Sequence, residues 1–148
     1  MQYIEAPNQE APKHKSLFLA GGITNCPDWQ SQVIEKLRGL DIAVFNPRRK
    51  NFSLDDPNAA EEQIRWEYER LRRADVISFW FSEGSLNPII LFKLGAALER
   101  QTPLVIGVHL AYPRKQDVEI QVALQKPDLR IVFDLSDLIG AIRKSMSG

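Results

Sequence analysis

Short apolar segments alternate with amphipathic ones along most of the chain, and this alternation constrains the fold more than any other feature. Runs of about four to eight residues rich in Val, Ile, Leu and Phe are typical of strands buried on both faces, whereas an apolar residue at every third or fourth position is typical of a helix. The strand-like segments span residues 16–22, 42–47, 75–81, 103–108 and 130–135, and the helix-like segments span residues 28–40, 59–74, 87–100, 115–126 and 136–146. Five strands alternating with five helices predict an α/β fold, a flavodoxin-like or Rossmann-like three-layer sandwich with a five-stranded parallel sheet.

The length of the chain and the composition of its first residues predict one domain behind a flexible tail. A chain of 148 residues is enough for one hydrophobic core and too short for two of ordinary size. Residues 1–14 are rich in Pro, Gln and Asn, and such segments bury too little apolar surface to fold by themselves. We therefore expect a flexible N-terminal tail at residues 1–14 and a single domain at residues 15–148.

The charge balance and the apolar runs argue against two classes of partner. Lysines and arginines number 19, as do aspartates and glutamates, so the chain lacks the basic excess of a protein that binds a nucleic acid polymer or a membrane surface. Its longest apolar runs are shorter than the ~20 residues of a membrane-spanning helix, and its first residues lack the apolar core of a secretory signal. One cysteine, Cys26, and two histidines make a poor metal set, so we expect no metal, no cofactor and a reducing, cytoplasmic location.

Ligands of parallel α/β sheets bind where the strands end, so the residues that follow each strand are the candidates for a binding site. Gly21 and Gly22 end the first strand, where they form either a tight turn or a loop that lets the backbone pass close to a ligand. Asn46 and Arg48 come at the end of the second strand. The Arg48 guanidinium suits a phosphate, although a solvated run of charges explains the same stretch.

Glu67 is the carboxylate whose place on its helix is least compatible with free solvation. It comes three residues after Ile64 and four before Leu71, and together with Tyr68 these two residues form the apolar stripe that we expect to face the core. A carboxylate on or beside a buried stripe is either the partner in an ion pair or hydrogen bond, or a group that meets a ligand. The sequence leaves both interpretations open.

Lys93 is the only charged residue between Pro88 and Leu98. A helix this apolar is normally buried, and buried lysines are rare because removing an ammonium group from water is costly. Either the stem of Lys93 is buried while its amine reaches solvent, or the amine faces a pocket, where a lowered pKa would let it act as a base or nucleophile. Ser85 and Asn87 precede this helix and suit its N-cap.

Several motifs, in this order, resemble the nucleoside 2-deoxyribosyltransferase-like family, in particular its short bacterial and phage branch. They are LFLAGGI, Trp29, VFNPRR, IRWEYERLRRADVISFWF, SLNPIILFKLGAAL and YPRKQDVEIQ, and the resemblance extends over about residues 16–142. It implies a flavodoxin-like fold, a homodimer or higher homo-oligomer, and a pocket at the strand ends that takes a nucleoside or nucleotide.

The same resemblance implies chemistry at the N-glycosidic bond. In the family a glutamate attacks the anomeric carbon of the deoxyribose, and the covalent glycosyl intermediate then passes to another base or to water. A second acidic group protonates the leaving base, and Glu67 matches the acidic position that interacts with the base. Gly21 and Gly22 match the turn beside the sugar, and Ser85 and Asn87 match the loop that holds the sugar hydroxyls or the phosphate.

The chain departs from the family at the residue that carries out the attack. Where the family has an apolar residue followed by Glu-Leu-Gly, residues 92–95 read Phe-Lys-Leu-Gly, so Lys93 stands at the nucleophile position. Because a lysine cannot form the glycosyl ester, we expect a nucleoside deoxyribosyltransferase or N-glycosidase with Lys93 and Glu67 at its catalytic positions and with impaired activity. The alternative is a non-catalytic nucleotide-binding or sensing module, in which Lys93 and Arg48 hold a phosphate.

Overall fold

The computed structural model describes residues 1–52 and 55–148, and its centre is a six-stranded parallel sheet. The strands are β1 (Gln2–Glu5), β2 (Ser16–Gly21), β3 (Ala43–Asn46), β4 (Val76–Phe81), β5 (Leu104–Val108) and β6 (Ile131–Val132). They are ordered β1-β3-β2-β4-β5-β6, and every neighbouring pair is parallel. Such a sheet requires helices on both of its faces, because both faces are apolar.

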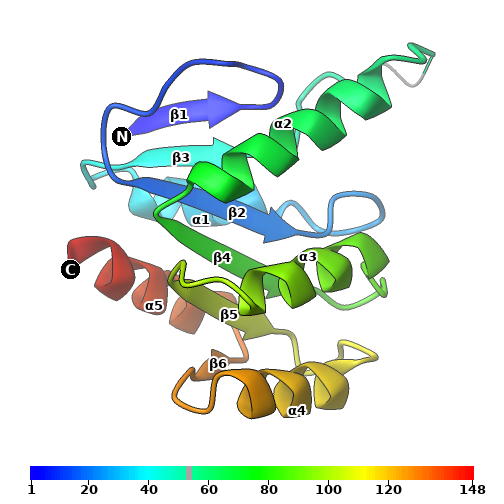
Figure 1. Ribbon diagram of the computed structural model, residues 1–148, viewed down its shortest axis with the longest axis vertical. Coiled ribbons are helices and arrows are strands. Elements are labelled where there is room, and N and C mark those ends of the chain that lie inside the picture. The colour runs from blue at the N-terminus through cyan, green and yellow to red at the C-terminus, as the bar shows by residue number, and fades with distance from the viewer. Residues whose placement is uncertain (53–54) are drawn as a thin grey trace.

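Helices cover both faces of the sheet. In the described parts of the chain they are α1 (Trp29–Leu37), α2 (Ala59–Arg73), α3 (Pro88–Leu98), α4 (Lys115–Gln125) and α5 (Leu135–Ser147). Figure 1 shows α2, α3 and α4 on one face and α1 and α5 on the other. None of the described helices is both long and apolar enough to cross a membrane. Without β1, the strand order is the 2-1-3-4-5 order of flavodoxin-like folds, so the predicted three-layer sandwich is confirmed.

The N-terminal segment belongs to the sheet, which differs from the flexible tail expected for residues 1–14. β1 pairs with β3 over four residues, and Ile4 is fully buried. Beyond the strand, the Asn8 carbonyl accepts hydrogen bonds from Trp66 Nε1 at 2.7 Å and from Arg70 Nη2 at 3.0 Å. A strand this short gives no periodic signal, and its pairing depends on a distant segment. The sheet therefore has six strands rather than the five expected.

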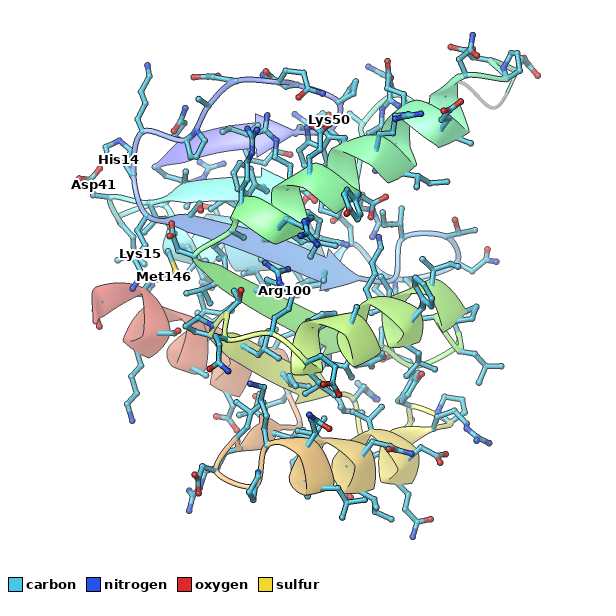
Figure 2. All side chains as sticks on the ribbon, in the orientation of Figure 1. His14, Lys15, Asp41, Lys50, Arg100 and Met146 are labelled. Carbon is cyan, nitrogen blue, oxygen red and sulfur yellow. The ribbon has the colours of Figure 1, made fainter. Side chains whose placement is uncertain are left out.

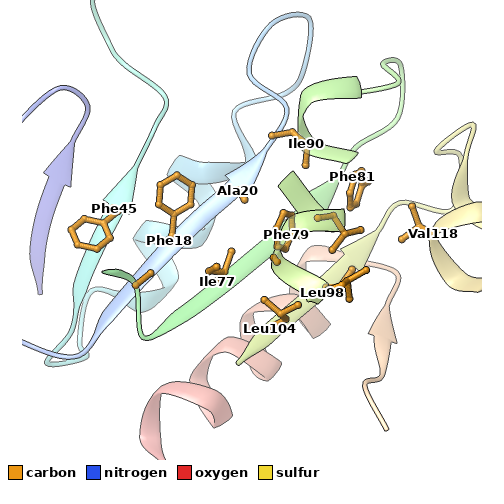
Figure 3. Packing of buried hydrophobic residues seen from close by; sticks show 14 of the residues in the cluster. Phe18, Ala20, Phe45, Ile77, Phe79, Phe81, Ile90, Leu98, Leu104 and Val118 are labelled. Carbon is orange, nitrogen blue, oxygen red and sulfur yellow. The ribbon is translucent and has the colours of Figure 1, made fainter. Parts of the chain in front are cut away.

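The core between α3 and the sheet is built from aromatic and branched side chains. Phe79 and Phe81 project from β4 with their ring centroids 6.5 Å apart. Ile90 and Leu98 of α3 belong to the same buried cluster (Figure 3). Burying a side chain of this size stabilises a fold by about 1.5–3 kcal/mol. One side of α3 therefore packs against the sheet, whereas Ile89 and Phe92 on its other side are 63% and 78% exposed, so the helix is not buried on all sides as its apolar sequence predicts.

The orientation of α2 is the opposite of the one that its apolar stripe predicts. Ile64 and Tyr68 are 66% and 61% exposed, whereas Trp66, Glu67 and Arg70 are buried. The expectation of an inward-facing stripe is therefore wrong for these two residues. A tryptophan buries more apolar area than an isoleucine, and its position on this helix decides which side faces the sheet.

Trp66 and Arg70 hold α2 in this orientation. The Trp66 ring is fully buried, with its centroid 6.1 Å from that of Phe18 and 6.3 Å from that of Phe45. The Arg70 guanidinium lies 5.0 Å from the centre of the Phe45 ring, a cation–π distance. Burial lowers the pKa of Arg70 from its usual value. Of the expected stripe, Leu71 alone packs partly against this core.

α2 and α3 are joined near their C-terminal ends. Arg100, two residues after α3, donates from Nη1 to the Leu71 carbonyl and from Nη2 to the Arg72 carbonyl, both at 3.1 Å. Figure 2 shows Arg100 between these two helix ends. The contact gives partners to carbonyl groups that the last turn of a helix leaves without them, and it fixes the spacing of the two helices.

The C-terminal elements differ in their bounds from the predicted ones. The last strand is only Ile131–Val132, shorter than residues 130–135. The last helix begins at Leu135 because Asp134, rather than Ser136, is its N-cap. Asp134 Oδ1 accepts a hydrogen bond from the Asp137 amide at 2.7 Å, which satisfies a free amide of the first turn.

Replacing Ile4 by alanine tests whether the N-terminal segment is an integral strand. We expect Ile4→Ala to lower the free energy of unfolding by about 2–4 kcal/mol, because it leaves a cavity at a fully buried position. Urea denaturation measures the change. Gln9→Ala, at an exposed position of the same segment, is the control and should change stability by less than about 0.5 kcal/mol. Equal, small effects at both positions would mean that the segment does not pack.

Candidate functional site

The candidate site lies where the sheet order reverses direction, at the carboxyl ends of β2 and β4. These two strands are neighbours, while the chain continues from β2 to β3 on one side and from β4 to β5 on the other. In folds of this kind the loops on either side of such a point diverge and leave a crevice for a ligand. Here the loops are residues 22–28, after β2, and residues 82–87, after β4.

Gly22 and Asn87 bring these two loops into contact. A Cβ atom on Gly22 would lie 2.3 Å from both Asn87 Oδ1 and Cys26 Sγ, closer than side chains can approach, so only glycine fits. Cys26 Sγ lies 3.4 Å from Asn87 Oδ1, to which it donates. Asn87 adopts a left-handed backbone with φ of 50°, and its backbone N–H donates to Ser85 Oγ at 3.3 Å. Three of the predicted ligand-binding residues therefore meet in one place.

The amide nitrogen of the Asn87 side chain is buried without a hydrogen-bond partner among the described residues. Asn87 as a whole is 7% exposed. Ser82, the residue after β4, is 1% exposed and its Oγ is likewise unpartnered there. Buried polar atoms normally have partners because leaving them without one is costly. Two such atoms at the end of β4 are typical of a site that is completed by another molecule.

Arg48 holds the first loop in place instead of presenting a free cation. Its Nη1 donates to the Pro27 carbonyl at 2.9 Å and to Gln30 Oε1 at 3.0 Å, and its Nη2 donates to the Cys26 carbonyl at 3.0 Å and to the Ile23 carbonyl at 3.3 Å. A guanidinium with four acceptors already in contact has little capacity left for a phosphate. Arg48 therefore positions the backbone of residues 22–28.

Gln30 is a site residue that the sequence reasoning missed. It is fully buried, and its Nε2 donates to the Gly22 carbonyl at 3.2 Å while its Oε1 accepts from Arg48. It thus connects the end of β2 to the end of β3. The signal was present, since Gln30 lies three residues before Val33 on the buried side of α1, where a polar residue needs partners.

Asn46 and Gly21 contribute to the framework of the site. Asn46 Oδ1 accepts from the Arg48 amide at 3.0 Å, and its Nδ2 donates to the Tyr3 hydroxyl at 3.0 Å. Burial, reinforced by the hydrogen bond to Glu5, raises the pKa of Tyr3 to about 12. A Cβ atom on Gly21 would lie 2.4 Å from the Trp29 ring, so this glycine allows α1 to pack on β2.

Lys93 and Glu67 form an ion pair between α3 and α2. Lys93 Nζ lies 2.5 Å from Glu67 Oε1, and the two side chains are 17% and 11% exposed. Of the two interpretations that the sequence leaves open for Glu67, the structure shows the buried partner in an ion pair. The Lys93 amine neither reaches free solvent nor stands alone in a pocket. Each charge compensates for the cost of desolvating the other.

The predicted site residues form two groups. Gly22, Ser85 and Asn87 meet at the loop contact, and Asn46 and Arg48 are connected to them through Gln30. Lys93 and Glu67 form the second group, deeper along α3. Two grooves lie elsewhere, one of about 320 Å³ between α3 and α4 and one of about 440 Å³ near the start of β5, and none of the predicted site residues lines either of them.

Tyr112 has a local role in the framework of the site. It lies in the loop after β5 and is 3% exposed, and its hydroxyl donates to the Leu86 carbonyl at 2.6 Å. This hydrogen bond helps to hold residues 82–87 in place. Among the described residues, no three His, Cys, Asp or Glu side chains gather where they would hold a metal ion.

Comparison with known proteins identifies the family and supports the fold. The sequence model of the family described as "Nucleoside 2-deoxyribosyltransferase like" matches residues 14–112. The chain belongs to this family. A crystal structure of a conserved protein from Enterococcus faecalis V583 has the same fold, with a TM-score of 0.62 and 16% sequence identity over 88% of this chain and 98% of that one. No curated protein matches the chain.

The contribution of the Lys93–Glu67 ion pair to the free energy of unfolding can be measured with single and double variants. Lys93→Met and Glu67→Leu should each lower the free energy of unfolding by about 3 kcal/mol, because each leaves a desolvated charge without its partner. The double variant should cost less than the sum of the two, since no uncompensated charge remains. Urea denaturation at neutral pH gives all three values.

The exposed ion pair of Arg65 and Glu61 on the same helix provides the matched control for this cycle. The two side chains lie 2.8 Å apart and are 74% and 65% exposed. Replacing either should change stability by about 0.5 kcal/mol or less, because solvent screens such pairs. If Lys93→Met and Glu67→Leu prove as mild as Arg65→Met, the buried pair does not form in solution.

Proposed function

We propose that this chain binds a nucleoside at the ends of β2 and β4 and does not form a covalent bond to its sugar. The observation that carries the proposal is the contact of 2.5 Å between Lys93 Nζ and Glu67 Oε1. In the resemblance to the family, position 93 corresponds to the nucleophilic glutamate and Glu67 corresponds to the acidic group near the base. In this chain these two side chains neutralise each other.

The ion pair opposes each step of the family chemistry. A carboxylate attacks an anomeric carbon only when an oxygen lone pair is free and directed at that carbon, and position 93 has no carboxylate. Glu67 has its Oε1 engaged by the Lys93 ammonium group at 2.5 Å, so this oxygen is not free to contact the leaving base as a general acid must. Glycosyl transfer or hydrolysis is therefore expected to be impaired, and ligand binding does not depend on either step.

The contact between Gly22 and Asn87 supports ligand binding, because it supplies hydrogen-bonding groups that take no part in a reaction. Asn87 Nδ2 is a buried donor without a partner among the described residues, and it lies beside the backbone of Gly22. A sugar hydroxyl or a base carbonyl would satisfy it. Both cations that suit a phosphate, Arg48 and Lys93, are already engaged, which favours a nucleoside over a nucleotide.

Binding and turnover are separable in one experiment. We expect saturable binding of one or more deoxynucleosides in titration calorimetry, with no release of free base detected by chromatography. Asn87→Gly should weaken binding by roughly threefold to tenfold, the effect of losing one hydrogen bond, and the left-handed backbone at this position accepts glycine without strain.

The control is Gln101→Ala, an exposed position before β5 at the opposite edge of the sheet, which should leave affinity unchanged. A second variant combines Lys93→Glu with Glu67→Gln, which places a carboxylate at position 93 without a like charge facing it. Base release by this variant alone would support the assignment of position 93. Base release by the unsubstituted chain would contradict the proposed absence of turnover. If no nucleoside binds, the proposal that the ligand is a nucleoside is wrong.

A further inference from the structure

Asn87 occupies the N-cap position of α3, but its side chain does not cap the helix. An asparagine at an N-cap ordinarily accepts a hydrogen bond from an amide of the first turn. Here the side-chain carboxamide contacts the loop after β2 instead, where Oδ1 lies 3.4 Å from Cys26 Sγ. In Figure 1 this loop lies beside the start of α3. The side chain thus gives up its local partner for one in a distant segment of the chain.

Cys26 contributes the thiol that meets this carboxamide. It is the single cysteine of the chain, it is 9% exposed, and its S–H donates to Asn87 Oδ1. A carboxamide has an accepting end and a donating end. Turned the other way, it would place Nδ2 against the sulfur, which is a weak acceptor, and Oδ1 would lose the donor that it has here. The thiol therefore distinguishes the two ends of the carboxamide, and Oδ1 is the end that faces it.

The surrounding backbone holds both partners of this contact in place. The Cys26 carbonyl accepts a hydrogen bond from Arg48 Nη2 at 3.0 Å, and the Cys26 backbone N–H donates to the Ile23 carbonyl at 3.4 Å. On the other side the carboxamide packs against Gly22, where a Cβ atom would lie 2.3 Å from Asn87 Oδ1. The thiol and the carboxamide are therefore in position before a ligand binds.

We propose that Cys26 is a positioning residue of the nucleoside site: its thiol holds Asn87 Oδ1 and so directs Nδ2 to the ligand. The proposal deepens the function proposed above and rests on it. A second observation points to the ligand, because Asn87 is 7% exposed and its Nδ2 has no hydrogen-bond partner among the described residues. Ser82 Oγ, at the other end of the same loop, is likewise buried without a partner there. A contact that only joined the two loops leaves these groups unexplained, since a buried polar group without a partner is costly.

An N–H group that is fixed in this way selects a ligand atom that accepts a hydrogen bond. A ligand N–H group at the same place would leave two buried donors facing each other, and each would lack a partner. Two kinds of oxygen in a nucleoside have the required chemistry, a carbonyl oxygen of the base and a hydroxyl oxygen of the sugar. Cys26 therefore affects specificity as well as affinity.

A double-mutant cycle tests whether Cys26 acts through Asn87, with titration calorimetry of 2′-deoxyinosine, 2′-deoxyadenosine, 2′-deoxyuridine and 2′-deoxycytidine. Cys26→Ala should weaken binding by roughly threefold to tenfold, because the carboxamide loses the donor that orients it. Cys26→Ser keeps a donor and should bind within about twofold of the unsubstituted chain. In the Asn87→Gly background Cys26→Ala should have no further effect, because the group that it positions is absent. A role in stability alone predicts neither the rescue by serine nor this loss of effect.

Asn87→Asp tests the class of the ligand atom, because a carboxylate has the shape of the carboxamide but only accepting oxygens. It should weaken binding at least as much as Asn87→Gly. Tighter binding by Asn87→Asp than by the unsubstituted chain would mean that the ligand presents a donor, and it would overturn the proposal. A preference for 2′-deoxyinosine over 2′-deoxyadenosine, whose base has no carbonyl, would assign the base as the source of the acceptor. Equal affinity for the two would assign the sugar.

Ser31→Ala is the matched control. Ser31 Oγ donates to Asp28 Oδ2 at 2.7 Å at an exposed position, so this variant also removes a side-chain donor but leaves the carboxamide in place, and it should not change affinity. Circular dichroism checks that each variant folds. If no nucleoside binds to the unsubstituted chain, the proposed function fails and this inference fails with it. If nucleosides bind, and Cys26→Ala either has no effect or weakens binding equally with and without Asn87, the inference alone is overturned.

Discussion

The packing of Trp66 between Phe18 and Phe45 is the contact on which the other features of this molecule depend. With the ring centroids 6.1 and 6.3 Å away, the indole fixes the rotation of α2 about its own axis. Arg70, one turn later, lies over the same aromatic group. The Asn8 carbonyl accepts from both side chains, so the same contact secures the N-terminal segment that adds β1 to the sheet.

That rotation has opposite consequences for the two sides of α2. On the inner side it turns Glu67 toward α3, where the carboxylate is desolvated and needs a cation, and Lys93 provides it at 2.5 Å. On the outer side it exposes Ile64 and Tyr68. The burial of Glu67 beside Lys93 and the exposure of Ile64 and Tyr68 thus have one structural cause.

The sequence predicted the layers of the fold well because they follow from local patterns. Buried strands and amphipathic helices leave a periodic signal that does not depend on distant contacts, and Gly21 and Gly22 lie at the predicted strand end. Features that arise from long-range contacts were missed. β1 exists because it pairs with β3, and the partners of Arg48 are carbonyls of a loop about twenty residues earlier. Ile64 was wrongly expected to face the core, because the packing of Trp66 that decides the orientation of α2 depends on Phe18 and Phe45.

The molecule is expected to bind a nucleoside without bonding to its sugar, and the intact mass of the protein measures this most directly. When a carboxylate nucleophile attacks the anomeric carbon of a 2-deoxy-2-fluoronucleoside, an ester bond to the sugar forms, the N-glycosidic bond breaks and the base leaves. The fluorine at C2 slows hydrolysis of this ester, so the fluorosugar stays on the protein. At concentrations that saturate binding, we expect the mass of the unmodified protein. A gain of one fluorosugar that maps to Glu67, or to any other carboxylate of the chain, would contradict it.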